Sequence, residues 1–198
     1  MSENFVYFDF GGVMFEHMYS LANVASSLGY PLDIFIKAWT GPDDQACRGD
    51  ITPRQMWREC LEALNYSGEI ADLTDQWVDG FTPNLRVHQL ALEVSRHCAV
   101  GVLSNLYKDL YPILLRRGLI PNINWNVIVL SSDIRSRKPE PNMYQEAEMR
   151  AGKRPEQLVV LDDKLANVYA ARARDWRGIL FDSTNPQSAI NEVLRLSN

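Results

Sequence analysis

Three aspartates that directly follow apolar runs of the sequence are the residues best placed to do chemistry. Asp9 follows residues 5–8 and precedes two glycines, and the adjacent pair Asp162 and Asp163 ends another such run. A carboxylate placed like Asp9 can attack phosphorus and form an aspartyl-phosphate, provided that a cation offsets the repulsion between two anions. Adjacent carboxylates such as Asp162 and Asp163 favour Mg²⁺, which prefers oxygen ligands. Taken alone, Asp9 and Asp163 could instead cap the turn or helix that follows.

Polar residues elsewhere in the chain can complete a phosphoryl-binding site. Ser104 and Asn105 offer a hydroxyl and adjacent backbone N–H groups that suit a phosphoryl oxygen, although both residue types are also common in turns. Lys138 precedes Pro-Glu-Pro, and in a loop stiffened by proline it can neutralise a nucleophile and a transferred group, or simply face solvent. Gly12 lets the backbone approach a ligand closely. We therefore predict that Ser104, Asn105 and Gly12 bind substrate.

These residues can act together only if the fold brings them to one place. Five apolar runs rich in β-forming residues are separated by longer stretches, at residues 5–8, 99–103, 127–130, 158–161 and 178–181. Continuous apolar runs are typical of strands buried on both faces of a parallel sheet. Ligands of such sheets bind just beyond the carboxyl ends of the strands. We therefore expect a Rossmann-like α/β core in which Asp9, Ser104 and Asp163 converge on one crevice.

The long interval between the first two runs has a helical pattern. Apolar residues recur at helical spacing from Leu21 to Leu28, Asp33 could cap the next helix, and Thr52-Pro53 is typical of a helix start. A further helix is predicted over residues 70–81. Four helices are too many for a single crossover, so we predict an inserted α-helical cap. The predicted domains are a core of residues 1–14 and 86–198 and a cap of residues 15–85.

Composition argues against several other classes of protein. Lys and Arg total 20 against 25 Asp and Glu, a net charge of -5 that leaves no electrostatic footprint for nucleic acid or an anionic membrane. The three cysteines lack CxxC spacing, so neither a disulfide framework nor a thiolate zinc site is expected. No signal peptide or membrane-spanning run is visible, and we expect a cytoplasmic protein. The sequence leaves open whether it is a monomer or a homodimer.

Taken in order, the candidate residues resemble the four motifs of the haloacid dehalogenase-like (HAD) hydrolase superfamily. These motifs are Asp9 in Phe-Asp-Phe-Gly-Gly-Val, Ser104 in Leu-Ser-Asn, Lys138 in Arg-Lys-Pro-Glu-Pro, and Asp162-Asp163 followed by Asn167. The resemblance spans essentially the whole chain. The segment from Arg48 to Thr52, followed by Met56-Trp57, also resembles the helical cap of class I members.

The resemblance implies a role for each matched residue. Asp9 would be the nucleophile and a magnesium ligand, and Lys138 would stabilise both Asp9 and the transferred phosphoryl group. Asp163 would be the principal carboxylate ligand of Mg²⁺, and Asp162 would assist directly or through water. The backbone carbonyl of Gly11 would be a further metal ligand. Asn167 would support this loop and Ser104 would bind the phosphoryl group.

Gly11 departs from the pattern of the family's phosphatases. They usually carry an aspartate at this position, which protonates the leaving group and then activates water. General acid–base catalysis contributes about 10²–10⁴-fold, and its loss weighs most on unactivated alkoxide leaving groups. Glu16 or His17 could supply a substitute proton, or either could be a solvated loop residue. The sequence thus predicts a magnesium-dependent phosphatase of small phosphorylated metabolites, slow or restricted to good leaving groups.

Two other functions stay open at this point. A metal-independent 2-haloacid dehalogenase also uses an aspartate nucleophile but has little use for the carboxylates of residues 162 and 163. A catalytically silent binding or regulatory protein would explain Gly11, but not the retention of the other motifs. The cap should determine the substrate, and Trp39, Arg48 and Trp57 are candidates to reach the pocket, while both tryptophans could equally lie in the core of the cap.

Overall fold

The computed structural model describes residues 3–197 and contains a five-stranded parallel sheet in the order β5-β4-β1-β6-β7. The strands are β1 (Phe5–Phe8), β4 (Ala99–Ser104), β5 (Val127–Leu130), β6 (Leu158–Asp162) and β7 (Arg177–Leu180). All five predicted strands are confirmed, with ends that differ by one residue at most. The strand order reverses around β1, which pairs with β4 on one side and with β6 on the other. This reversal places the carboxyl ends of β1, β4 and β6 side by side.

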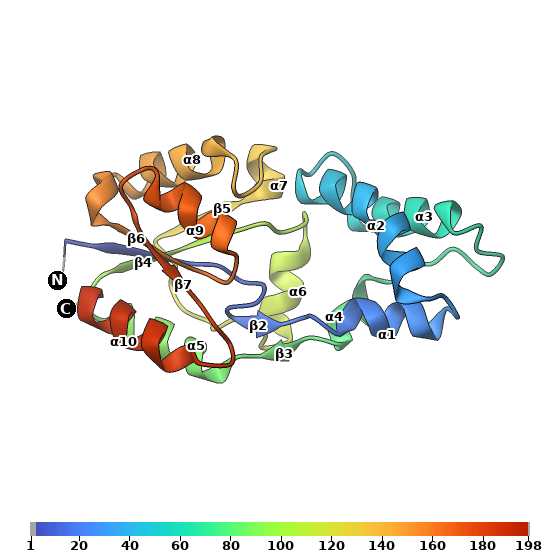
Figure 1. Ribbon diagram of the computed structural model, residues 1–198, viewed down its shortest axis with the longest axis horizontal. Helices are drawn as coiled ribbons and strands as arrows, with labels where there is room; N and C mark the ends of the chain where they lie inside the picture. The colour runs from blue at the N-terminus through green and yellow to red at the C-terminus, as the bar shows by residue number, and fades with distance from the viewer. Residues whose placement is uncertain (1–2, 198) are drawn as a thin grey trace.

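Helices cover both faces of the sheet (Figure 1). Along β1, Phe5 and Tyr7 pack with buried residues of α8 and α9, whereas Val6 and Phe8 belong to the larger cluster that includes α5, α6 and α10. The covering helices are α5 (Leu85–Val94), α6 (Leu110–Arg116), α8 (Pro141–Ala151), α9 (Leu165–Arg172) and α10 (Pro186–Ser197), with the short α7 (Ser131–Ile134) and the 3₁₀ helix η1 (Pro155–Gln157) between them. Burial on both faces explains why the strands are continuously apolar. The predicted α/β core is confirmed.

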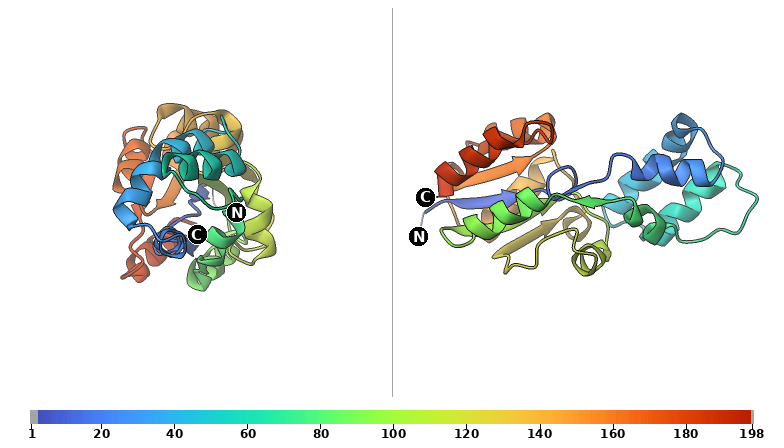
Figure 2. Two further views of the ribbon diagram at one scale, coloured as in Figure 1. Left: turned by 90° about the vertical axis from the view of Figure 1, so that its right-hand side faces the viewer. Right: turned by 90° about the horizontal axis from the view of Figure 1, so that it is seen from below.

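A second layer of helices lies beyond the carboxyl edge of the sheet (Figures 1 and 2). These four, called the cap helices below, are α1 (Ser20–Ser27), α2 (Leu32–Cys47), α3 (Pro53–Ala63) and α4 (Thr74–Asp79). The chain leaves the core through β2 (Phe15–Glu16) and returns through β3 (Thr82–Pro83), and these two short strands pair antiparallel. The cap helices lie within the predicted insertion, whose boundaries at residues 15 and 85 stay a prediction.

Helix α3 begins as its sequence predicts. The Thr52 hydroxyl accepts a hydrogen bond from the N–H of Gln55, and the Gln55 side chain accepts one from the N–H of Thr52. Pro53 occupies the first helical position, where its missing N–H costs nothing. Reciprocal capping of this kind satisfies backbone donors that a helix start otherwise leaves without partners.

Two other helix predictions were wrong in detail. Helix α2 is capped by Pro31, whose carbonyl accepts from the N–H of Phe35 at 3.0 Å, so Asp33 lies inside the first turn and caps nothing. A carboxylate there still interacts favourably with the helix dipole. The helix expected over residues 70–81 is shorter, because Asp72 accepts from the N–H of Thr74 at 2.9 Å and a side-chain turn precedes α4.

Two expectations about protein class can be compared with the structure. Cys47, Cys60 and Cys98 are buried free thiols. Among the helices of residues 3–197, none is both long enough and apolar enough to cross a membrane.

Candidate active site

Asp9 lies directly beyond β1, at the centre of the sheet's carboxyl edge. Its backbone N–H donates to the carbonyl of Leu161 in β6 at 3.0 Å, which continues the strand pairing up to this residue. The chain then turns sharply, and the carbonyl of Phe10 accepts from the N–H of Met14 at 2.7 Å. The N–H of Phe10 donates to Asp9 Oδ1 at 2.7 Å. The turn therefore fixes one carboxylate oxygen of Asp9.

Lys138 contacts two of the predicted carboxylates. Its Nζ lies 2.9 Å from Asp9 Oδ2 and 2.6 Å from Asp162 Oδ2, and the residue is only 3% exposed. Burial alone would lower the pKa of Lys138, but the negative charges of Asp162 and Asp9 raise it well above its usual value. Lys138 is therefore a permanent cation at the centre of the site, and the structure brings it to Asp9 as the motif predicts.

Asp9 has an unusual pKa for an aspartate. Burial raises it to about 6, Lys138 opposes the shift, and the charges of Asp162 and Asp163 add to it. A shift of this size is common where clustered carboxylates share one site. At neutral pH Asp9 is still mostly ionised, which a nucleophile requires.

Asp162 is the most completely bound of the three carboxylates. It is fully buried and accepts hydrogen bonds from Lys138 Nζ, from Asn167 Nδ2 at 2.9 and 3.0 Å, and from the N–H of Lys164 at 2.8 Å. Both oxygens thus already have protein donors. In this arrangement Asp162 orients Lys138 and the start of α9, and its contact with Mg²⁺, direct or through water, stays a prediction. Asn167 supports this loop, as predicted.

Asp163 presents the opposite situation. Its Oδ1 is buried and has no hydrogen-bond partner among residues 3–197, and burial with the charge of Asp162 raises the pKa of Asp163. Oxygen atoms of Asp9, Asp162 and Asp163 all lie within 4.8 Å of one another. A buried carboxylate oxygen without a donor is costly unless a cation is bound. The oxygen-only donor set and the orphaned Asp163 Oδ1 therefore fit Mg²⁺.

Gly12 supports Asp163 in a way that its sequence did not predict. Its φ is +76°, and a Cβ at this position would collide with the Asp163 carboxylate. Its N–H donates to the carbonyl of Phe15 at 2.8 Å, so it is not free to bind a substrate oxygen. Gly12 thus supplies space for Asp163, and its predicted role in substrate binding stays a prediction.

Gly11 lies against His17, one of the two residues considered as substitute proton donors. A Cβ at Gly11 would lie 3.3 Å from His17 Cε1, so the imidazole fills the place where a side chain at position 11 would begin. The ring also packs edge-on against Phe15 and Phe81, with centroid distances of 6.0 and 5.9 Å. Burial and the charge of Lys164 lower the pKa of His17, which favours the neutral ring.

Ser104 and Asn105 follow β4 but have different surroundings. Ser104 is buried beside β1, and its hydroxyl makes no hydrogen bond within the described part of the chain, so it can bind a ligand oxygen as predicted. The Asn105 side chain is already engaged: its Oδ1 accepts from the N–H of Lys138 at 2.7 Å, and its Nδ2 donates to the Lys138 carbonyl at 3.0 Å. The side chain of Asn105 therefore positions Lys138, and contact of Asn105 with substrate stays a prediction.

A cavity of about 130 Å³ lies between Gly11 and the cap helices. Trp39 lines it, as predicted, whereas Trp57 is fully buried and donates to Thr74 Oγ1 at 3.1 Å within the cap. Arg48 does not line the cavity but bridges the cap to the core. Other walls come from both layers, and they include Phe15, His17, Asp43, Trp77, Phe81, Asn105, Tyr107, Arg137 and Lys164.

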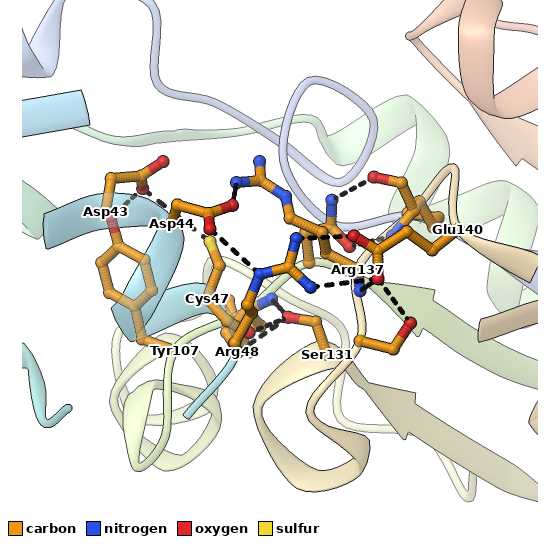
Figure 3. Close-up of polar contacts among 12 residues, drawn as sticks. Asp43, Asp44, Cys47, Arg48, Tyr107, Ser131, Arg137 and Glu140 are labelled. Carbon is orange, nitrogen blue, oxygen red and sulfur yellow. Dashed lines mark hydrogen bonds and ion pairs between the residues drawn. The ribbon is translucent and has the colours of Figure 1, made fainter. Parts of the chain in front are cut away.

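Asp43 is a cavity residue that sequence reasoning missed. Its Oδ1 accepts from the Tyr107 hydroxyl and from Cys47 Sγ, and its other oxygen has no partner among residues 3–197 (Figure 3). Burial raises the pKa of Asp43, while Tyr107 and Arg137 oppose the shift. The residue lies in a helix next to a second aspartate, Asp44, and nothing in the sequence indicates which of the two faces the core.

The solved structures that resemble this chain share its fold. No family model matches the chain. The magnesium complex of a HAD family enzyme from Bacteroides thetaiotaomicron is similar, with a TM-score of 0.79 and 18% identity over 95% of this chain and 97% of that one. The same enzyme in complex with magnesium and inorganic phosphate gives a TM-score of 0.68 at 18% identity, covering 92% and 96%.

Two further solved structures belong to different enzymes. A predicted HAD-like family hydrolase from Porphyromonas gingivalis has a TM-score of 0.72 and 16% identity over 97% of this chain and 98% of that one. L-2-haloacid dehalogenase from Xanthobacter autotrophicus, with chloropropionic acid covalently bound, has a TM-score of 0.68 and 16% identity over 97% and 82%. Likeness at such identities defines the architecture and not the reaction. The chain therefore has the haloacid dehalogenase-like fold that its four motifs predict.

Proposed function

We propose that this protein is a magnesium-dependent phosphatase-type hydrolase of small phosphorylated metabolites that acts through an aspartyl-phosphate on Asp9. The observation that carries the proposal is the buried Oδ1 of Asp163, which has no hydrogen-bond partner and lies in a carboxylate cluster whose one contacting cation, among residues 3–197, is Lys138. Three carboxylates and one ammonium leave excess negative charge in a buried place. A divalent cation together with an anionic substrate would balance it.

Asp9, Lys138 and Ser104 supply the nucleophile, a fixed cation and a phosphoryl contact for the chemical steps. An oxygen of Asp9 forms a bond to phosphorus while the bond from phosphorus to the leaving oxygen breaks, and the leaving oxygen takes up a proton from water, because Gly11 offers no side-chain acid. Water then attacks the phosphorus, which releases inorganic phosphate and restores the carboxylate. Lys138 lies 2.9 Å from Asp9 and neutralises negative charge in both steps. The free hydroxyl of Ser104 binds a phosphoryl oxygen.

Mg²⁺ would be held by Asp9 and Asp163, with the Gly11 carbonyl as a further predicted ligand. Bound there, it would reduce the repulsion between the nucleophile and the phosphoryl oxygens. Asp162 would support the metal site by orienting Lys138 and the start of α9, because both of its oxygens accept hydrogen bonds from protein donors. The similar Bacteroides thetaiotaomicron enzyme, crystallised with magnesium and inorganic phosphate, supports this reading.

A 2-haloacid dehalogenase is the second candidate, because such enzymes are also among the similar structures. It would attack carbon with the same aspartate and would need no metal. The orphaned oxygen of Asp163 weighs against it, since without a cation that buried atom has nothing to bind among residues 3–197. Retention of Asp9, Ser104 and Lys138 in one site weighs against a catalytically silent protein.

Release of p-nitrophenol from p-nitrophenyl phosphate, with Mg²⁺ and with EDTA, tests the proposal. We expect activity only with Mg²⁺, and loss of that activity in Asp9→Asn, because an amide cannot attack phosphorus. Asp182→Asn is a matched control: Asp182 also follows a strand of the sheet, but it is exposed and bonds only to its own turn. The control variant should keep wild-type activity.

Each other outcome identifies a different function. Chloride release from a 2-chloro acid that is indifferent to EDTA would replace the proposal by a dehalogenase. Magnesium binding without turnover on a broad panel of phosphate esters would indicate a silent binding protein. Equal activity of Asp9→Asn and wild type would remove Asp9 as the nucleophile.

A further inference from the structure

We propose that Arg48, at the end of α2, is a positioning residue for Lys138: it ties the cap to the loop that carries this lysine, so that docking of the cap holds Lys138 against Asp9 and Asp162. The inference rests on the role of Lys138 in the proposed function. It assigns to the cap a part in assembling the catalytic group, in addition to enclosing the substrate. The loop concerned, called the lysine loop below, consists of residues 136–140.

Arg48 makes a two-pronged contact with the lysine loop (Figure 3). Its Nη1 lies 3.0 Å from Glu140 Oε2 and its Nη2 lies 2.5 Å from Glu140 Oε1, while its Nε donates to Asp44 Oδ2 at 3.0 Å. The planar guanidinium thus joins a carboxylate of α2 to one of the core. Such a fork fixes orientation as well as distance, which a lysine at this position could not do.

Glu140 connects the Arg48 side chain to the backbone around Lys138. It also accepts hydrogen bonds from Ser136 Oγ at 2.8 Å and from the N–H of Arg137 at 3.3 Å, so it closes the lysine loop upon itself. Arg137 makes a second link to the cap, with its Nη1 2.6 Å from Asp44 Oδ1. Hydrogen bonds from Arg48, Ser136 and the N–H of Arg137 lower the pKa of Glu140, which keeps this carboxylate ionised. The residues on both sides of Lys138 are therefore anchored to α2.

The end of α2 is also packed too closely against the core to shift freely. Gly49 has a φ of +72°, and a Cβ there would collide with the backbone carbonyl of Ser132. The Ser131 hydroxyl donates to the carbonyl of the last residue of α2. From the core side, the Asn105 amide holds both backbone groups of Lys138. Lys138 is thus fixed from the core by Asn105 and from the cap through Arg48.

The position of Lys138 should affect the rate of the proposed reaction, because its ammonium group contacts the nucleophile. Its Nζ contacts Asp162 and Asp9 at 2.6 and 2.9 Å, and both contacts require the lysine loop to stay in place. A misplacement of about 1 Å in a catalytic group can cost about 10²-fold in rate. Loss of Arg48 should therefore reduce kcat more than it changes KM.

The test compares Arg48→Met with Arg117→Met in the full-length protein. Arg117 also joins the core to the cap, through Asp75 and Asp79 of α4, but it does not touch the lysine loop. For Arg48→Met we expect at least about a tenfold fall in kcat with p-nitrophenyl phosphate. We also expect faster backbone hydrogen exchange in residues 136–140. Arg117→Met should change neither, and Arg48→Lys should lie between wild type and Arg48→Met.

Hydrogen exchange decides the inference independently of catalysis. Unchanged exchange in residues 136–140 of Arg48→Met would overturn it, and so would an equal loss of kcat in Arg48→Met and Arg117→Met. If the wild-type protein released no p-nitrophenol, the proposed function would fail, while the exchange result would still decide whether Arg48 restrains the lysine loop. If Arg48→Met does not fold, Glu140→Gln breaks the same link and is measured in the same way.

Discussion

Placing a carboxylate at position 11 tests whether the missing acid limits the proposed phosphatase activity. The backbone of Gly11 lies outside the left-handed region, so an aspartate can adopt it without strain. The obstacle is local: the new Cβ would lie 3.3 Å from His17 Cε1, and the ring must move by a few tenths of an ångström. We therefore consider Gly11→Asp both alone and combined with His17→Ala.

The size of the effect follows from two opposing contributions. A positioned general acid is worth about 10²–10⁴-fold for a poor leaving group. Where the new carboxylate reaches the leaving group only with the His17 ring displaced, an off-rotamer cost of about 0.5–1.5 kcal/mol lowers the productive population, and hence the rate, by about 2- to 13-fold. Gly11→Asp alone should thus gain activity on alkyl phosphates, and the double variant should gain more by about that factor.

The assay measures kcat/KM for an alkyl ester, β-glycerophosphate, and for an aryl ester, p-nitrophenyl phosphate. We expect the alkyl-to-aryl ratio to rise at least about tenfold in the double variant, because the aryl leaving group needs little protonation. No rise in this ratio in either variant would refute the reasoning about Gly11. His17→Ala alone serves as the control, and a selective loss of alkyl turnover in it would identify His17 as the existing donor.

Two further predictions concern stability and metal binding. Gly12→Ala should abolish Mg²⁺ binding in calorimetric titration, because the new methyl group displaces Asp163. It should also lower the free energy of unfolding by more than the cost of a left-handed alanine, which is about 1–2 kcal/mol. The control is Gly152→Ala, which is also left-handed but lies in open space, and it should show only the smaller loss of stability and retain normal metal binding. Arg48 lowers the pKa of Glu140 to about 2. The ionised Glu140 carboxylate therefore stabilises the fold at pH values above the ordinary pKa of glutamate, near 4.5. The stability difference between wild type and Glu140→Gln, no more than about 1 kcal/mol, should therefore be full at pH 7 and shrink as the pH falls from about 4.5 towards 2. A difference that stays constant down to pH 2 in chemical denaturation would contradict this.

The core could be predicted from the sequence because its signals are local. Each strand is a short apolar run, and a parallel sheet necessarily brings the residues after its strands to one edge. That rule is sufficient to place Asp9, Ser104 and Asp163 together. Thr52 likewise predicts the start of α3, because a capping box involves only residues within one helical turn.

The surroundings of the site could not be predicted in the same way. Both oxygens of Asp162 are hydrogen-bonded because of Lys138, Asn167 and the start of α9, and the space beside Asp163 depends on Gly12. The contact of Arg48 with Glu140 joins residues 92 positions apart and depends on how the cap docks. No periodicity or spacing in the sequence encodes such contacts, because they arise from the packing of two separately patterned layers.

The paired strands β2 and β3 have a consequence for how this architecture can be altered. The chain enters and leaves the helical layer through two neighbouring strands, with Phe15 beside Pro83 and Glu16 beside Thr82. Paired strands lie about 5 Å apart, so both ends of the insertion are close together. Figure 2 shows both connections running from the core to the helical layer. When the ends of a segment lie side by side, a change in its length adds little loop-closure entropy, about 0.6 kcal/mol for each doubling. The helical layer is therefore an exchangeable module: another insertion, or a short turn, could be joined to the same pair of strands while β1 and Asp9 keep their places.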